Sequence, residues 1–184
     1  MSFMREFKVG VLGAPNVGKT TLFNYISGAK EKVGNWPGTT VERKEAYIQH
    51  GDMRITLIDV PGSYSLIPSS YDEKIVSDFL YNEKPDLVVV VANATNLYNT
   101  LYLAIEVIEL GFRAIVVLNM FDKVKDKGIE IDVKRIEEKL GVRVIPAVGN
   151  KGVGVKEIKG EIIKALLNQS YEKKELLIPY AKPV

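Results

Sequence analysis

One glycine-rich stretch decides the fold of this chain: Gly13-Ala14-Pro15-Asn16-Val17-Gly18-Lys19-Thr20. The stretch matches the pattern G-x-x-x-x-G-K-[ST] at every fixed position. An apolar run at 7–13 precedes it and a helical spacing at 18–28 follows it, so we expect it to join a strand to a helix. In such a loop successive backbone N–H groups face one centre, and the helix N-terminus adds positive potential. The sequence therefore predicts a phosphate-binding loop, called the P-loop below.

The side chains of the P-loop have separate expected roles. Lys19 should reach the β- and γ-phosphates as a point charge, and the Thr20 hydroxyl should bind Mg²⁺, which prefers oxygen ligands. An ordinary glycine-rich turn is the alternative, and the complete match between a strand and a helix argues against it. The residues expected to bind the nucleotide here are Gly13, Ala14, Pro15, Asn16, Val17, Gly18, Lys19, Thr20 and Thr21.

Short valine-rich runs alternate along the chain with segments of helical spacing, which is typical of an α/β protein. A tight turn at His50-Gly51-Asp52 should join two of the strands as a hairpin. With the P-loop, we therefore expect an α/β P-loop NTPase with a mostly parallel six-stranded sheet, one antiparallel edge strand and helices on both faces. The expected strands are 7–13, 41–50, 53–60, 86–92, 113–118 and 142–146, and the expected helices are 18–28, 72–81, 97–110, 131–140 and 155–167.

The composition limits what else the chain can be. Its 184 residues suit one domain, which we assign to 1–168, followed by a C-terminal tail at 169–184. The 25 basic and 23 acidic residues give a net charge of +2. This charge is too balanced to indicate a nucleic-acid partner. The absence of cysteine excludes disulfides and thiolate metal sites, and His50, the one histidine, leaves almost no material for a Ser-His triad. No apolar run reaches the roughly 18 residues of a spanning helix, and the first residues do not resemble a signal peptide, so we expect a soluble chain.

A carboxylate and a glycine follow the second strand of the hairpin. Asp59 ends this apolar strand, where it can hold Mg²⁺, often through water. Gly62 could then offer its backbone N–H to the γ-phosphate, because no side chain blocks the approach. A strand-terminating turn is the alternative, since Asp, Pro and Gly also favour turns. The P-loop upstream favours the metal site, and we expect the segment 61–71 to be a mobile loop.

A second expected loop, 29–40, contains two threonines that could bind the same metal ion. Thr39 or Thr40 should supply a second hydroxyl to Mg²⁺ when a triphosphate is bound, and the spacing does not choose between them. Loss of the γ-phosphate would free this loop, as in the order–disorder switch of GTPases. A solvated pair of threonines at the start of a strand is the alternative.

An Asn-x-x-Asp pattern follows the strand at 113–118. Asp122 can accept two parallel hydrogen bonds from guanine, and adenine lacks this pair of donors. Asn119 can tie its loop to the P-loop and to the base edge, although both residues are also common helix N-caps. Met120 stands where a lysine is usual, so we expect weaker nucleotide retention. The last base-binding loop should lie near 147–151, where Val148-Gly149-Asn150 replaces the more usual Ser-Ala-Lys.

These motifs together resemble the translation-factor-like class of small GTPases, and more narrowly the ferrous-iron transport protein B family. The resemblance covers about residues 6–168, and its first stretch is highly specific. The residues that carry it are Val33-Gly34-Asn35-Trp36-Pro37-Gly38-Thr39-Thr40-Val41-Glu42-Arg43-Lys44-Glu45, Asp59-Val60-Pro61-Gly62-Ser63-Tyr64-Ser65-Leu66, Asn96-Leu97, Leu101-Tyr102-Leu103 and Leu118-Asn119-Met120-Phe121-Asp122.

The resemblance implies the small-GTPase fold and a regulatory GTPase domain that gates ferrous-iron transport, with GTP as substrate, GDP as product and Mg²⁺ as cofactor. It selects Thr40 over Thr39 as the Mg²⁺ ligand. It further implies that a helical domain and a membrane-spanning transport domain follow in the full-length protein, with 169–184 as the start of the helical part. The domain would then lie on the cytoplasmic side of the cell membrane. Asn16 resembles the asparagine of cation-dependent GTPases that bind K⁺ beside the phosphates, although a neutral loop residue is the alternative.

Catalysis should be slow, because the residues that usually accelerate hydrolysis are missing. Ser63 and Tyr64 stand where a Ras-like protein has a water-orienting glutamine. Arg43 lies near the first loop, but a solvent-facing strand residue is its more ordinary interpretation. The residues expected to take part in hydrolysis are therefore Lys19, Thr40, Gly62 and Asn16.

Two other functions compete with this one. A soluble assembly GTPase acting on RNA or the ribosome would usually carry a basic arm. The lysines near residue 125 are interrupted by an aspartate, which is typical of a solvent-exposed surface rather than of such an arm. An ATP-dependent P-loop kinase is opposed by Asn119 and Asp122. The sequence does not indicate an oligomeric state.

Overall fold

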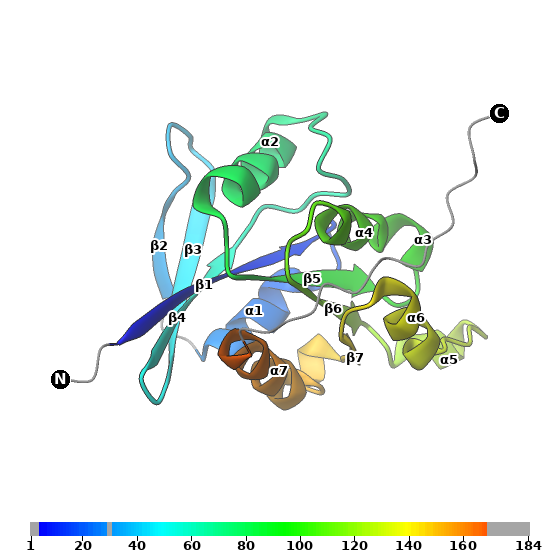
Figure 1. The fold of residues 1–184 in the computed structure, drawn as a ribbon. Coiled ribbons are helices and arrows are strands. Elements are labelled where there is room, and N and C mark those ends of the chain that lie inside the picture. Colours follow the sequence, from blue (N-terminus) through cyan, green and yellow to red (C-terminus); the bar gives the residue numbers. More distant parts are fainter. Residues whose placement is uncertain (1–3, 29–30, 169–184) are drawn as a thin grey trace.

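A seven-stranded sheet runs through the middle of the molecule, and helices cover both of its faces (Figure 1). The computed structural model describes residues 4–28 and 31–168, so the expected tail at 169–184 lies outside the described residues. The strands are β1 (Arg5–Gly13), β2 (Glu31–Asn35), β3 (Glu42–His50), β4 (Met53–Asp59), β5 (Leu87–Asn93), β6 (Ala114–Asn119) and β7 (Val144–Pro146). The helices are α1 (Lys19–Ser27), α2 (Tyr71–Asp78), α3 (Leu97–Thr100), α4 (Tyr102–Glu109), α5 (Lys123–Asp126), α6 (Val133–Leu140) and α7 (Val155–Leu167).

The strand order is β2-β3-β4-β1-β5-β6-β7, and the sheet is mostly parallel, as expected. The expected hairpin is present as β3 and β4, which pair antiparallel from Lys44–Asp59 to His50–Met53. The sheet has seven strands rather than six because Glu31–Asn35 pairs antiparallel with β3 and becomes the edge strand. All residues of β2 are exposed, so neither face of this strand needs apolar side chains. Its sequence therefore lacks the apolar–polar alternation from which a strand is predicted.

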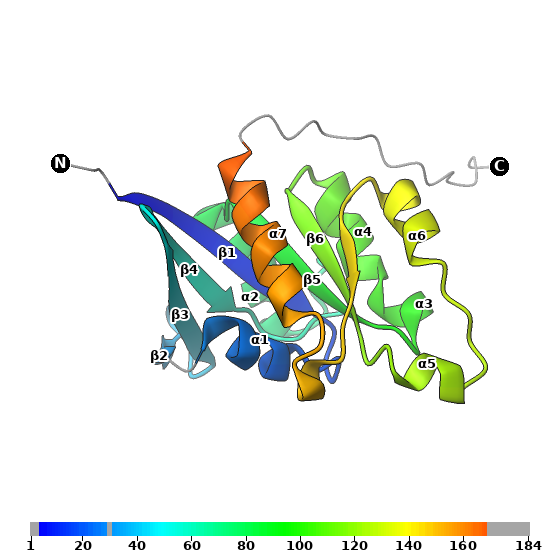
Figure 2. The same ribbon diagram turned by 90° about the horizontal axis from the view of Figure 1, so that it is seen from below.

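Two apolar layers hold the helices against the sheet. Helices α1 and α7 cover one face, where Phe23 and Ile158 pack beneath β1 and β5 (Figure 2). Helices α2, α4 and α6 cover the other face, where Phe79 and Leu103 join the second layer. Strands β5 and β6 are buried along almost their whole length, which explains their nearly unbroken valine-rich sequence.

Every expected helical segment overlaps a helix, but some bounds differ and one segment is divided in two. The segment expected as one helix at 97–110 breaks at Leu101 into α3 and α4, and the short helix α5 was not expected. Helix α2 continues into a π-helical turn, Phe79–Glu83. No helix within 4–28 and 31–168 is both long and apolar enough to cross a membrane.

The fold brings the predicted site segments to one edge of the sheet. Strands β1, β4, β5, β6 and β7 run parallel, so their carboxyl ends meet at this edge. The P-loop follows β1, Asp59 ends β4, Asn119 ends β6, and the turn at Gly149–Lys151 follows β7. Segments separated by more than a hundred residues are thereby placed side by side.

Candidate functional site

The P-loop leads from β1 into the N-terminus of α1, as predicted. Gly18 precedes the helix with φ of 81°, a left-handed conformation that favours glycine. A Cβ atom at Gly18 would lie 2.4 Å from Nδ2 of Asn119, so a side chain there would force the Asn119 amide to move. No side chain caps α1 and its first turn holds no acidic residue, so the positive end of the helix is open to an anion.

Lys19 and Asp59 form an ion pair that joins the P-loop to the end of β4. The two side chains are only 10% and 13% exposed, so the pair is largely screened from water. The ion pair places the carboxylate expected to bind the metal beside the lysine expected to bind the phosphates. In the described part of the chain, no three His, Cys, Asp or Glu side chains gather as a metal cluster. One carboxylate with a threonine hydroxyl instead fits Mg²⁺, which commonly completes its ligands with phosphate oxygens and water.

Gly62 packs directly against the P-loop. A Cβ atom there would lie 3.2 Å from Cα of Pro15, closer than nearly all real contacts of this kind. The next residue, Ser63, donates its backbone N–H to the Gly13 carbonyl over 2.9 Å and is itself buried. The backbone after Asp59 is thus held beside the phosphate-binding loop, where the sequence placed it.

Asn119 connects the P-loop to the last loop of the site. Its Nδ2 donates to the Val17 carbonyl over 2.8 Å, and its Oδ1 accepts the backbone N–H of Gly149 over 2.8 Å. The side chain is 3% exposed, so both bonds are shielded from water. The predicted tie between this asparagine and the P-loop is therefore present, and it extends to the loop after β7.

Asp122 lies beside this connection at the start of α5. Its side chain does not cap the helix, so the N-cap interpretation finds no hydrogen bond to support it. Oδ2 instead accepts from Nζ of Lys151 over 3.2 Å, and both side chains reach solvent. The sequence assigned guanine to Asp122 but no partner within the protein, although Lys151 lies in the predicted base loop 147–151.

The remaining base-loop residues lie on the same side of the sheet edge. Met120 is half-buried with φ of 58°, and its methyl group lies close to the position of a Cβ at Gly18. Val148 is buried and pairs with Val153 as an isolated bridge that closes the turn after β7. Asn150 is exposed at the tip of that turn. Met120 thus covers the end of the P-loop with an apolar group and leaves no ammonium there.

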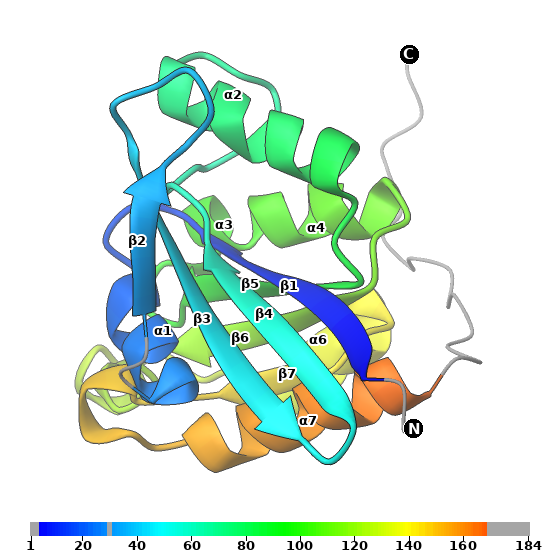
Figure 3. The ribbon, with the colours of Figure 1, turned by 90° about the vertical axis from the view of Figure 1, so that its left-hand side faces the viewer.

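Thr40 is not brought to the P-loop by any described contact. The loop of residues 36–40, called the Trp36 loop below, leans against α2 (Figure 3). Thr39 Oγ1 donates to the Trp36 carbonyl over 2.9 Å and accepts from the Val41 N–H over 3.0 Å, so its hydroxyl is used within the loop. Thr40 is exposed. This arrangement leaves Thr40, rather than Thr39, as the hydroxyl available to a metal.

The expectation that Arg43 faces solvent is wrong. Its side chain is 15% exposed and pairs with Glu83 and Glu45. The guanidinium also stacks on the ring of Trp36, 4.4 Å from the ring centroid. The sequence could not indicate this position, because Glu83 lies in a turn forty residues away that only the folded sheet brings near.

Comparison with known proteins places the chain in one family. The family model described as ferrous iron transport protein B matches residues 7–162. The chain belongs to this family. The Fe(2+) transporter FeoB of Escherichia coli strain K12 is 40% identical over 185 aligned residues, which cover 98% of this chain and 23% of that protein. The chain therefore spans about a quarter of the length of the curated relatives that it matches.

Solved FeoB structures agree with the fold. The FeoB G domain of Methanococcus jannaschii is 39% identical, with a TM-score of 0.78 over 90% of this chain and 100% of that one. The cytosolic domain of Thermotoga maritima FeoB in its GMPPNP form is 40% identical, with a TM-score of 0.83 over 89% of this chain and 65% of that one. The expected α/β P-loop fold and the FeoB resemblance are confirmed, and the alternative of an assembly GTPase acting on RNA finds no support in these matches.

Proposed function

We propose that this chain binds guanine nucleotides and slowly hydrolyses GTP to GDP and phosphate, as the regulatory domain of a ferrous-iron transporter. The observation that carries the proposal is the pair of buried hydrogen bonds through which Asn119 joins the P-loop to the loop after β7. These bonds support the proposal because they hold the segment that leads to Asp122, whose carboxylate would bind the base, against the P-loop, which would bind the phosphates. The Thermotoga maritima cytosolic domain, a relative, has been solved in GDP and GMPPNP forms.

Each part of the nucleotide would have its own partner. The P-loop backbone and Lys19 would hold the phosphates, and Asp122 would accept the ring N–H and the exocyclic amine of guanine. The backbone of Val148-Gly149-Asn150 would line the base opposite Asp122. Met120 would pack on the base without adding a charge, which favours weak retention of the nucleotide.

Mg²⁺ would be held by Thr20, Thr40 and Asp59 together with phosphate oxygens. Its charge would offset the negative charge that develops on the phosphates during hydrolysis. Because Lys19 and Asp59 bond to each other in this structure, nucleotide and metal would have to separate them, with Lys19 turning to the phosphates. Gly62 would then offer its N–H to the γ-phosphate from its place beside Pro15.

GTP hydrolysis would be slow because Ser63 and Arg43 supply neither a water-orienting side chain nor an arginine finger. Ser63 is buried and its N–H is bonded to Gly13, so it is not placed to orient a water molecule as a glutamine would. Arg43 is occupied by two carboxylates and cannot serve as an arginine finger without leaving them. The helical and membrane transport domains of a full-length protein would be the partners that read the nucleotide state, with this domain on the cytoplasmic side.

A competition experiment tests the proposal directly. GDP and GTP should displace a fluorescent GDP analogue in the presence of Mg²⁺, whereas ATP should not, because adenine lacks the donor pair that Asp122 accepts. GTP should be hydrolysed, and RNA retained on filters across a salt series should not exceed background. Equal displacement by ATP and GTP would refute the guanine assignment.

The single tryptophan offers a test of the metal role of Thr40. We expect the emission spectrum of Trp36 to differ between the GDP form and the form with a non-hydrolysable GTP analogue and Mg²⁺. The reason is that Thr40 binding to the metal would draw the Trp36 loop away from α2. Thr40→Ala should abolish most of this spectral difference, whereas Thr39→Ser, which keeps the hydroxyl bonded within the loop, should preserve it. Identical spectra in both nucleotide states would mean that the loop does not respond to the γ-phosphate.

A further inference from the structure

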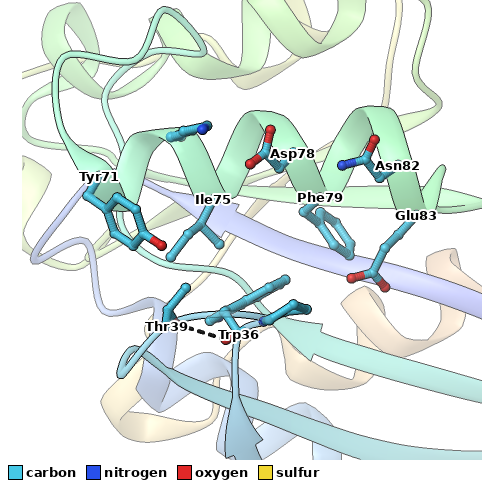
Figure 4. Close-up of a pocket in the computed structure, with 10 residues that line it drawn as sticks. Trp36, Thr39, Tyr71, Ile75, Asp78, Phe79, Asn82 and Glu83 are labelled. Carbon is cyan, nitrogen blue, oxygen red and sulfur yellow. Dashed lines mark hydrogen bonds between the residues drawn. The ribbon is translucent and has the colours of Figure 1, made fainter.

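Trp36 is buried although it belongs to an exposed loop. Its side chain is 4% exposed, and the edge of its ring system meets the ring of Phe79 at a centroid distance of 5.8 Å and an angle of 82°. Figure 4 shows the Trp36 loop facing α2, with Trp36 opposite Ile75 and Phe79. The backbone N–H of Trp36 bonds to the Val41 carbonyl over 2.9 Å, which closes the base of the loop. The tryptophan thus acts as an apolar anchor that docks the loop on α2.

Arg43 and Glu83 hold this anchor from the polar side. The guanidinium donates two parallel hydrogen bonds to the Glu83 carboxylate, with Nη2 to Oε2 at 2.9 Å, while its plane stacks on Trp36. The two side chains are 15% and 23% exposed, and bidentate pairs of this kind are among the stronger hydrogen bonds in proteins. Burial would raise the pKa of the Glu83 carboxyl, but the bonds from Arg43 and Lys8 outweigh it and leave this pKa below its ordinary value.

The pair joins two elements that follow the segments expected to sense the γ-phosphate. Arg43 lies on β3, immediately after the Trp36 loop, and Glu83 ends the π-helical turn that continues α2. Helix α2 in turn follows the segment that begins at Gly62. Because Arg43 is held within β3, the link between this pair and the loop is the stacking of the guanidinium on Trp36, a contact that exists only while Trp36 is docked on α2. The stacking therefore favours the docked position of the loop over any position nearer the P-loop.

We infer that Arg43 and Glu83 are a positioning pair that, through Trp36, holds the Trp36 loop on α2 and so restrains Thr40 from reaching Mg²⁺. The inference rests on the proposed nucleotide function. A contact present only in the docked position lowers the population of the released one. A GTP analogue with Mg²⁺ needs the released position and GDP does not, so the pair weakens binding of the analogue selectively. Loss of the pair should therefore strengthen analogue binding and leave GDP binding almost unchanged.

The first test needs no nucleotide. Glu83→Gln keeps the shape of the side chain and removes its charge, so we expect acrylamide to quench Trp36 emission about two-fold more strongly than in the parent protein. Glu45→Gln is the matched control, because Glu45 also bonds Arg43 over 2.8 Å but lies on the same strand and makes no link to α2. Arg43→Gln removes the other partner of the pair and should change the quenching in the same direction as Glu83→Gln.

The second test measures nucleotide preference. With Mg²⁺ present, Glu83→Gln and Arg43→Gln should bind a non-hydrolysable GTP analogue about five-fold more tightly, with GDP affinity within about two-fold of the parent. Parental quenching and a parental ratio of analogue to GDP affinity in both folded variants would overturn the inference, as would the same changes in Glu45→Gln. A parent protein that binds neither nucleotide would refute the proposed function instead, and the quenching experiment would still decide whether the pair docks the loop.

Discussion

Asp122→Asn should weaken GDP binding by about 100-fold and reverse the preference between GDP and xanthosine diphosphate. The asparagine carbonyl can still accept one guanine N–H, but its amide meets a second guanine donor where the carboxylate accepted a charge-assisted bond. Loss of one such bond costs about 2–3 kcal/mol, which corresponds to the expected weakening. Xanthine carries a carbonyl in place of the exocyclic amine, so the new amide gains an acceptor. Competition binding with GDP and xanthosine diphosphate measures both effects.

A control in the same short helix separates base recognition from general loss of charge. Asp126 ends α5 and is exposed, so Asp126→Asn removes the same charge without reaching the base. We expect this variant to keep the parental preference for GDP. If Asp122→Asn bound GDP as tightly as the parent, Asp122 would not be the base acceptor, and its bond to Lys151 would be its role instead.

The contacts that link the predicted motifs follow from the order of the strands. The sequence placed Asn119 after an apolar run and the P-loop after another, and parallel strands bring both ends to one edge of a sheet. The hydrogen bond from Asn119 to the Val17 carbonyl could therefore be expected. Gly18 was expected from the pattern, and the structure adds a steric reason, since a side chain there would displace the Asn119 amide.

The features that the sequence did not indicate depend on pairing between distant segments. Strand β2 lacks apolar alternation because neither of its faces is buried, so only its register against β3 identifies it. The sequence suggests a surface residue at Arg43, and only the fold shows that Glu83 lies opposite it. Lys151 is exposed, but its pairing with Asp122 likewise depends on the fold. Long charged side chains can reach several partners, and periodicity carries no information on which one they meet.

K⁺ should raise the rate of GTP hydrolysis about ten-fold above the rate in Na⁺ at matched ionic strength. Negative charge grows on the bridging and γ-phosphate oxygens as the terminal phosphoryl group leaves, and GTPases commonly offset it with an arginine finger. Arg43, the arginine that directly follows the Trp36 loop, is held by two carboxylates and so does not offer its charge to the phosphates in this structure. The Asn16 side chain is exposed at the edge of the P-loop, where its carbonyl could hold a monovalent cation against the phosphates. A ten-fold gain needs only about 1.4 kcal/mol of preference for the transition state.

The backbone at Asn16 decides how this expectation must be tested. Its φ is 62°, a left-handed conformation that asparagine tolerates better than most residues. Asn16→Ala would therefore remove the carbonyl and strain the P-loop at once, whereas Asn16→Gly removes the carbonyl and keeps the conformation. We expect both variants to lose the stimulation by K⁺, and Asn16→Gly to bind GDP about as tightly as the parent. Stimulation that survives in Asn16→Gly would show that Asn16 serves the shape of the loop, and equal rates in K⁺ and Na⁺ for the parent would remove the cation from the reaction.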